Sequence, residues 1–141
     1  MNEKLTADYR LLTTFSEEPT MPFVLDLHRV LSNTTWIFFL LLGLWGLYRA
    51  IRQYGVDGSY LGAMAVGEIL FIVQAVLGLI LVFGSASPGR GVHFLYGVFA
   101  LVAMPGAFAY VRGDDSNNTQ WLYALLTLFL FGIALRAIGT A

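Results

Sequence analysis

The fold is decided by an uncharged apolar stretch, Trp36-Ile-Phe-Phe-Leu-Leu-Leu-Gly-Leu-Trp-Gly-Leu47. This stretch is the centre of a longer apolar segment, which extends from about Pro22 to Ile51 and is followed by Arg52. A helix needs about 20 consecutive, predominantly apolar residues to cross the hydrocarbon core of a bilayer. The segment meets this requirement, so we expect it to be the first membrane span and to act as the insertion signal.

Three further apolar segments follow, separated by short polar turns. They are expected over residues 60–83, 91–111 and 119–138. Because turns this short force neighbouring helices to pack antiparallel, the sequence predicts an all-α integral membrane protein. Its expected architecture is an up-down-up-down four-helix transmembrane bundle over residues 21–141. A polar N-terminal segment, residues 1–20, precedes the bundle and is a candidate for an interfacial location.

The composition supports a membrane protein and excludes several functions. Of the 141 residues, 57% are hydrophobic and 12% are charged, whereas soluble domains carry about 25% charged residues. The net charge of −1 gives no clustered basic face for nucleic acid. The chain has no cysteine, which excludes disulfides, iron–sulfur clusters, covalent haem attachment through cysteine and thiolate catalysis.

The arginines next to the spans suggest an orientation. Arg49, Arg52 and Arg112 flank spans on one side of the predicted bundle. By the positive-inside rule this side faces the cytoplasm. We therefore expect a protein of a prokaryotic cell membrane with its N-terminus outside.

The two histidines of the chain, His28 and His93, fall at matching depths. His28 lies six residues after Pro22 and His93 five residues after Pro88, so both lie roughly 7–9 Å into their helices at about 1.5 Å per residue. Spans one and three run in the same direction and face each other across the bundle. Two imidazoles could therefore meet one ligand from opposite sides, as a haem iron with two axial histidines requires.

The surroundings of the histidines also suit a haem. Small residues and a glutamine near the histidines would leave room for a flat macrocycle and offer it one polar group. Two arginines near the same membrane surface could pair with haem propionates, which are carboxylates that need charge-assisted partners. The predicted cofactor-binding residues are His28, Arg29, Gln74, Gly78, Arg90, His93 and Gly97, with His28 and His93 as the metal ligands of a haem b.

Each of these features also has a purely structural interpretation. A histidine near a helix end can hydrogen-bond between helices, the small residues can be plain helix packing, and Gln74 can join two helices. Glu68, an ionisable residue inside span two, is interpreted as structural or as a proton carrier. Aromatic residues near the span ends, Tyr60 and Tyr123 among them, are expected to be interface anchors.

Three stretches together resemble a known family. They are Leu27-His28-Arg29-Val30-Leu31, Gln74-Ala-Val-Leu-Gly-Leu-Ile-Leu-Val82 and His93-Phe-Leu-Tyr-Gly-Val-Phe-Ala-Leu101. Their order resembles one half of haem A synthase, whose four-helix halves each carry a His-Arg helix, a Gln-x-x-Leu-Gly helix and a further histidine helix. The resemblance implies that His28 and His93 are the axial ligands of a b-type haem.

The chain also departs from that family. Its fourth helix follows the other three, whereas the family has a helix before the His-Arg helix. Only Asp26 stands for the acidic residue expected before the His-Arg pair, and the chain is too short to contain both halves. The resemblance therefore supports a haem-binding bundle better than it supports the synthase reaction.

The expected function is that of a small b-type haem protein that transfers single electrons. It would be a subunit of a respiratory or photosynthetic complex and exchange electrons with a quinol or a redox protein, because bis-imidazole ligation leaves no open iron position. Two alternatives stay open. One is a haem A synthase-like enzyme acting as a half-size unit or homodimer, so enzymatic activity is undecided. The other is a cofactor-free accessory subunit that binds pigment or lipid; transport has less support.

Overall fold

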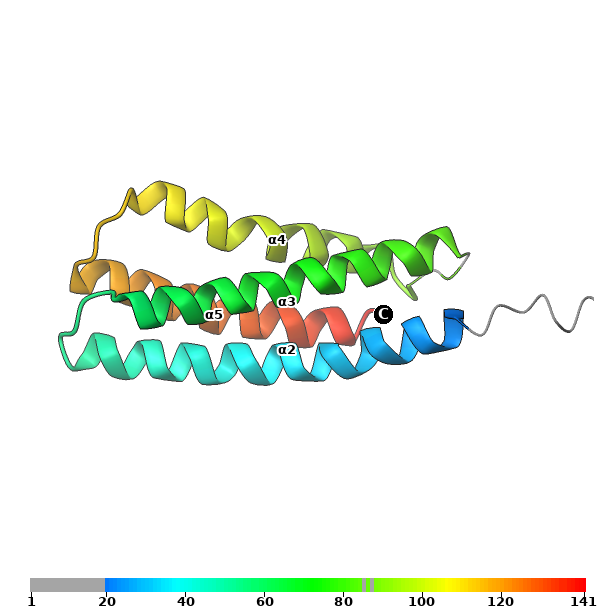
Figure 1. The fold of residues 1–141 in the computed structure, drawn as a ribbon, viewed down its shortest axis with the longest axis horizontal. Helices are drawn as coiled ribbons and strands as arrows, with labels where there is room; N and C mark the ends of the chain where they lie inside the picture. The colour runs from blue at the N-terminus through cyan, green and yellow to red at the C-terminus, as the bar shows by residue number, and fades with distance from the viewer. Residues whose placement is uncertain (1–19, 85, 87) are drawn as a thin grey trace, which may run out of the picture.

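Four long helices make up nearly all of the computed structural model, which describes residues 20–84, 86 and 88–141 (Figure 1). The helices are α2 (Thr20–Ile51), α3 (Gly58–Phe83), α4 (Val92–Val111) and α5 (Asn117–Ile138). All four are long and apolar enough to cross a membrane, and the described residues form no strand. The predicted all-α transmembrane bundle is therefore confirmed. The proposed interfacial segment lies outside the described residues, except that Thr20 begins α2.

Two of the helices, α3 and α5, begin directly after a residue whose side chain caps them. Asp57 caps α3 by accepting a hydrogen bond from the backbone N–H of Tyr60 at 2.9 Å. Ser116 caps α5 by accepting one from the N–H of Thr119 at 3.3 Å. These polar caps satisfy backbone donors at the first turn. As a result α3 and α5 begin two residues before the apolar runs that marked them in the sequence, while the ends of all four helices coincide with the expected ones.

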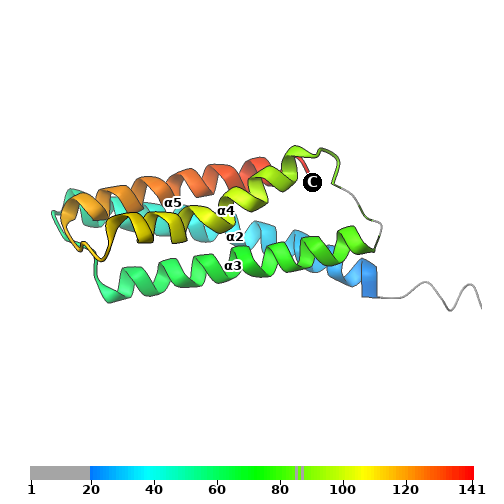
Figure 2. The ribbon, with the colours of Figure 1, turned by 90° about the horizontal axis from the view of Figure 1, so that it is seen from above.

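The helices are arranged so that α2 and α4 lie diagonally across the bundle. Each of them packs against both α3 and α5, but they do not pack along each other (Figure 2). The α2–α5 pair is the most extensive and the α3–α4 pair the least. Figure 1 shows the turns 52–57 and 112–116 together at one end, which we call the closed end. The start of α2, the α3–α4 connection and the C-terminus lie at the other, the histidine end.

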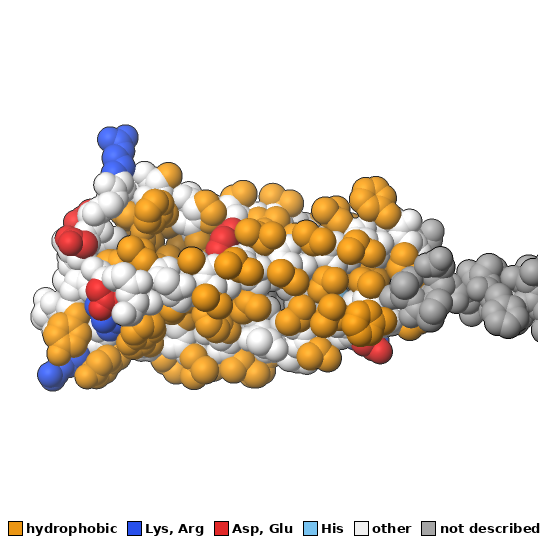
Figure 3. Space-filling view, viewed as in Figure 1, with side chains coloured by type: hydrophobic (Ala, Val, Ile, Leu, Met, Phe, Trp, Pro, Cys, Tyr) orange, Lys and Arg blue, Asp and Glu red, His pale blue; other side chains and the backbone are white. Residues whose placement is uncertain are grey.

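The surface of the bundle matches a membrane environment. In the face seen in Figure 3, hydrophobic side chains cover the middle of the molecule, and arginine side chains gather at the closed end. Large apolar residues on all four helices are exposed, among them Leu41, Ile69, Val102 and Leu125. In water such a surface would be unfavourable, whereas lipid provides an apolar solvent for it.

Tyr60 and Tyr123 are buried in the core, so the expectation that they are interface anchors is wrong. Their side chains are 0% and 1% exposed. The hydroxyl of Tyr60 lies 3.5 Å from Oγ1 of Thr127, which is also buried. A buried tyrosine needs such a polar partner. Gly46 makes the arrangement possible, because a Cβ there would collide with the Tyr60 hydroxyl.

A polar network joins three helices at the closed end. Arg49 of α2 forms an ion pair with Asp57, with Nη1 and Oδ2 2.9 Å apart, and donates to the backbone oxygen of Gly55 at 2.7 Å. The Tyr60 N–H and, after it, the Arg49 guanidinium keep the pKa of Asp57 below its ordinary value. Asn117 of α5 donates to the oxygen of Ala50 at 3.0 Å and so caps α2.

An aromatic layer separates the closed end from the histidine end. The rings of Phe39 and Phe71 are stacked, with centroids 4.5 Å apart and an interplanar angle of 22°. Both side chains are buried together with Leu42, Met64 and Met104. Dense packing of this kind holds the helices in a fixed register, and it limits how far the space at the histidine end extends into the bundle.

Candidate functional site

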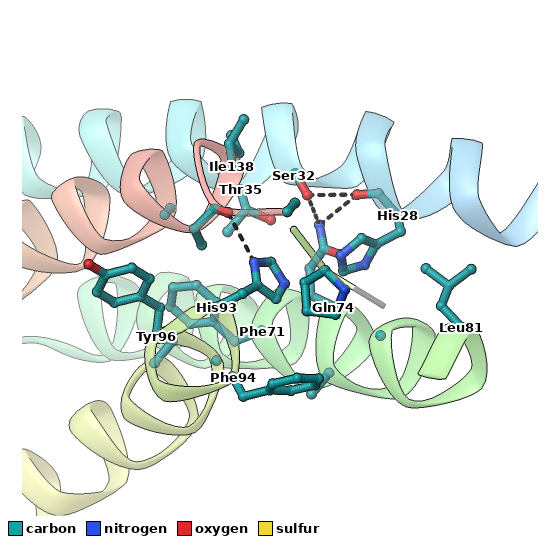
Figure 4. Close-up of a pocket in the computed structure, with 18 of the residues that line it drawn as sticks. His28, Ser32, Thr35, Phe71, Gln74, Leu81, His93, Phe94, Tyr96 and Ile138 are labelled. Carbon is teal, nitrogen blue, oxygen red and sulfur yellow. Dashed lines mark hydrogen bonds between the residues drawn. The ribbon is translucent and has the colours of Figure 1, made fainter. Parts of the chain in front are cut away.

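The two histidines come together at the histidine end of the bundle. His28 extends from α2 and His93 from α4, the two diagonal helices, and their ring centroids lie 6.2 Å apart with an interplanar angle of 64° (Figure 4). Both residues are half-buried. Since α2 and α4 do not pack along each other, these side chains meet across the centre of the bundle.

The hydrogen bond of His93 defines which ring nitrogen carries the proton. Its Nδ1 lies 3.0 Å from the backbone oxygen of Ala137. A carbonyl oxygen only accepts, so Nδ1 carries the hydrogen and Nε2 keeps its lone pair in the neutral ring. Ala137 is in the last turn of α5, and its oxygen also accepts from the N–H of Thr140 at 3.1 Å and from the Thr140 hydroxyl at 3.0 Å. Metal-binding histidines are commonly held by the same kind of backbone contact.

His28 is held through its backbone by Gln74 of α3. The Gln74 Nε2 donates to the His28 oxygen at 3.2 Å and to the Ser32 Oγ at 3.1 Å. The Ser32 hydroxyl in turn donates to the same His28 oxygen at 2.7 Å. Figure 4 shows these three contacts as a small triangle between α2 and α3. The Nδ1 of His28 and the Oε1 of Gln74 are buried and have no hydrogen-bond partner among the described residues.

A cavity of about 630 Å³ surrounds the two histidines. Its volume falls within the range of about 300–1,000 Å³ that is usual for ligand pockets. All four helices contribute to its wall, which is mostly apolar, and Phe71 forms part of it. The wall contains many small residues, which leave the space open: Ala75, Gly78, Gly97, Ala100, Ala134 and Ala137.

Six of the seven predicted cofactor-binding residues line this cavity. They are His28, Arg29, Gln74, Gly78, His93 and Gly97. Arg90 is exposed and is not part of the wall, although its backbone N–H donates to the Thr140 oxygen at 3.1 Å next to the site. Glu68 is also outside the wall, and its Oε2 is buried without a partner among the described residues.

Two histidines without a third ligand would suit a metal that is already bound to most of its ligands, as the iron of a haem is. The described residues contain no group of three or more His, Cys, Asp or Glu side chains that could hold a metal ion, whereas a structural zinc site takes four protein ligands. A haem iron needs only two, because the porphyrin supplies the other four. His28 and His93 would be the two residues that hold it, since their ring centroids are 6.2 Å apart.

Sequence reasoning included the possibility that Gln74 joins two helices, which its hydrogen bonds confirm, but it missed that the partner is the His28 backbone, and it missed the carbonyl that holds His93. The carbonyl of Ala137 has no sequence signature, because every residue carries one. The contact of Gln74 with the His28 backbone depends on how α2 and α3 are rotated about their axes. Comparisons of the chain with protein-family models, curated proteins and solved structures give no match.

Proposed function

We propose that this chain is a small membrane b-type haem protein that transfers single electrons, with His28 and His93 as the two axial ligands. The observation that carries the proposal is the meeting of the two imidazoles, 6.2 Å apart, at the wall of a cavity large enough for a cofactor. The haem would supply a redox-active iron. The motif resemblance to half of haem A synthase supports the same ligand pair.

The residues of the cavity would have separate roles. The Ala137 carbonyl holds His93 with Nε2 free to bind, and the apolar wall keeps water from the centre of the site. Arg29, which lines the cavity and is exposed, would pair with a propionate at the membrane surface. Arg90 would pair with a propionate only if its side chain extended from the α3–α4 connection to the cavity. Two imidazole ligands leave no open coordination position, which favours electron transfer over oxygen chemistry.

The cavity wall includes residues that face the lipid. Leu79 on α3 and Val98 on α4 line the cavity, yet they are 55% and 60% exposed. The cavity thus reaches the outer surface along the α3–α4 contact. This favours an electron partner within the membrane, a quinol or a neighbouring subunit of a respiratory or photosynthetic complex. With the N-terminus outside, the haem would lie near the outer face of a prokaryotic cell membrane.

Visible absorption spectra of the purified protein test this proposal. Protein produced with ample haem should show the sharp band pair of a b-type cytochrome on reduction. His28→Ala and His93→Ala should each abolish or strongly alter these bands, whereas Thr34→Ala, an exposed position on α2, should leave them unchanged. A colourless protein would overturn the proposal. Unchanged spectra in both histidine variants would show that the ligands are assigned wrongly.

A cofactor-free accessory subunit is the second candidate. It is favoured by the contacts that already tie the site together without a ligand, from Gln74 to α2 and from His93 to α5. In that case the histidines serve helix packing alone. His93→Ala would then lower stability in colourless protein, and the cavity would accept pigment or lipid.

A further inference from the structure

Two of the unpartnered buried atoms belong to residues that already touch. Among the described residues, three buried side-chain atoms lack a hydrogen-bond partner: His28 Nδ1, Glu68 Oε2 and Gln74 Oε1. Gln74 is bonded to the backbone oxygen of His28. Gln74 therefore has an unused acceptor oxygen, and His28 has a ring nitrogen that can carry a proton.

The orientation of the Gln74 amide follows from its partners. The His28 backbone oxygen can only accept, so the group that lies 3.2 Å from it must be the NH₂ of Gln74. The Ser32 hydroxyl donates its proton to the same oxygen and therefore accepts from Gln74. Both assignments leave Oε1 as the free acceptor, and they exclude the flipped amide.

We propose that Gln74 is the positioning residue of His28: its Oε1 accepts the Nδ1–H of the imidazole and keeps the Nε2 lone pair free to bind. In the structure neither of these two atoms has a hydrogen-bond partner among the described residues, so the bond forms when the His28 ring rotates about its side-chain bonds, which does not require α2 to move. The opposite tautomer would set a nitrogen lone pair beside the oxygen lone pairs of Gln74. His93 has the same tautomer through the Ala137 carbonyl, so Nε2 carries the lone pair in both rings.

The tautomer of His28 can be measured directly by NMR, because the chain contains two histidines and their signals are easily told apart from the rest. Haem-free protein labelled with ¹⁵N-histidine gives one pair of nitrogen signals for each ring. Above about pH 8 an ordinary histidine is neutral, and the signals report the tautomer. Wild-type protein should show Nδ1–H at both rings. In Gln74→Met, which has similar length but no acceptor oxygen, the ratio of the Nδ1–H to the Nε2–H tautomer of His28 should fall by a factor of about 2 to 12, as expected for one lost hydrogen bond.

Two controls accompany this variant. His93 is an internal control, since its acceptor is a backbone carbonyl and its tautomer should not change. Ser32→Ala removes the other side-chain partner of the same amide but leaves Oε1, so the tautomer of His28 should be kept. The inference is overturned if wild-type His28 carries its proton on Nε2. It is also overturned if Gln74→Met leaves His28 unchanged or alters both histidines equally.

The consequence for a redox centre rests on the proposed function, but the tautomer measurement does not. If the protein binds haem, an imidazole that donates from Nδ1 is the more basic ligand and stabilises the oxidised iron. Gln74→Met should then raise the midpoint potential, and Ser32→Ala should not. A colourless protein with a Gln74-dependent tautomer would overturn the proposed function and leave this inference standing.

Discussion

The two ends of the bundle should respond in opposite ways to the same substitution, glycine to alanine. At Gly46, on the closed end, an added Cβ would collide with the Tyr60 hydroxyl and lie 3.2 Å from the backbone Cα of Ala124. Tyr60 is fully buried, so it has little room to move aside. Overpacking of a dense core costs about 1–3 kcal/mol, and Gly46→Ala should lower the free energy of unfolding by this amount.

At Gly78, on the histidine end, the same methyl group fits without a collision. The nearest atom would be Cε1 of His28 at 3.8 Å, an ordinary van der Waals contact. Alanine has a better helix propensity than glycine by about 0.5–1 kcal/mol, so Gly78→Ala should unfold at the same or a slightly higher denaturant concentration. If the chain binds haem as proposed, Gly78→Leu should place its side chain in the cavity and lower the haem content while the protein stays folded.

Unfolding in mixed detergent and SDS, followed by circular dichroism, measures the stability of these variants, and absorbance measures haem content. Equal stability of Gly46→Ala and Gly78→Ala would refute the contrast between a densely packed closed end and a cavity at the other end. Full haem content in Gly78→Leu would show that the cofactor does not occupy the space beside His28.

Three further predictions concern other contacts. Asn117→Ala removes two hydrogen bonds, one to the oxygen of Ala50 in the last turn of α2 and one to the oxygen of Tyr54 in the turn that follows, and should lower the unfolding free energy by about 1–3 kcal/mol; no change in SDS unfolding would argue against this cap. Because the pKa of Asp57 is lowered in the folded protein, its contribution to stability is present at neutral pH and is lost as the pH falls below the ordinary value of about 3.9. Asp57→Asn should therefore weaken the acid-induced loss of stability in a pH titration, and an unchanged acid profile would contradict this. Arg29→Gln should speed haem loss to apomyoglobin more than Arg90→Gln, since only Arg29 lines the cavity; equal rates would contradict this difference.

Hydropathy was enough to predict the helices, because a bilayer forces every span to be long, apolar and internally hydrogen-bonded. The short turns then determined that α2 and α4 are parallel, and this was enough to expect His28 near His93. The burial of Tyr60 could not be predicted in the same way. It depends on the rotation of α3 about its axis and on Thr127 and Gly46, which lie far away in the sequence.

The detailed geometry of the candidate site could not be predicted from the sequence either. A cavity results from how four helices fail to fill a space, and no single residue encodes it. The position of Arg90 depends on the course of the α3–α4 connection, so its proximity to His93 in the sequence did not place it in the cavity wall. By contrast, Arg29 adjoins His28 on a helix, where the spacing of residues determines their positions.

The weak packing of α4 has a consequence for how such a protein would acquire a cofactor. Within this helix only Ala100 and Met104 are buried, and its contact with α3 is the least extensive of the four. The start of α4 is tied to Ala137 of α5 and to Thr140 just after it by the hydrogen bonds of His93 and of the Arg90 N–H, so it could move away from α3 only if these two bonds broke. A flat, apolar molecule dissolved in the bilayer would then reach the cavity laterally, between α3 and α4, without passing through water. Cofactor binding would depend on the separation of α3 and α4. A covalent cross-link between these two helices would retain any ligand that was in the cavity when the link formed.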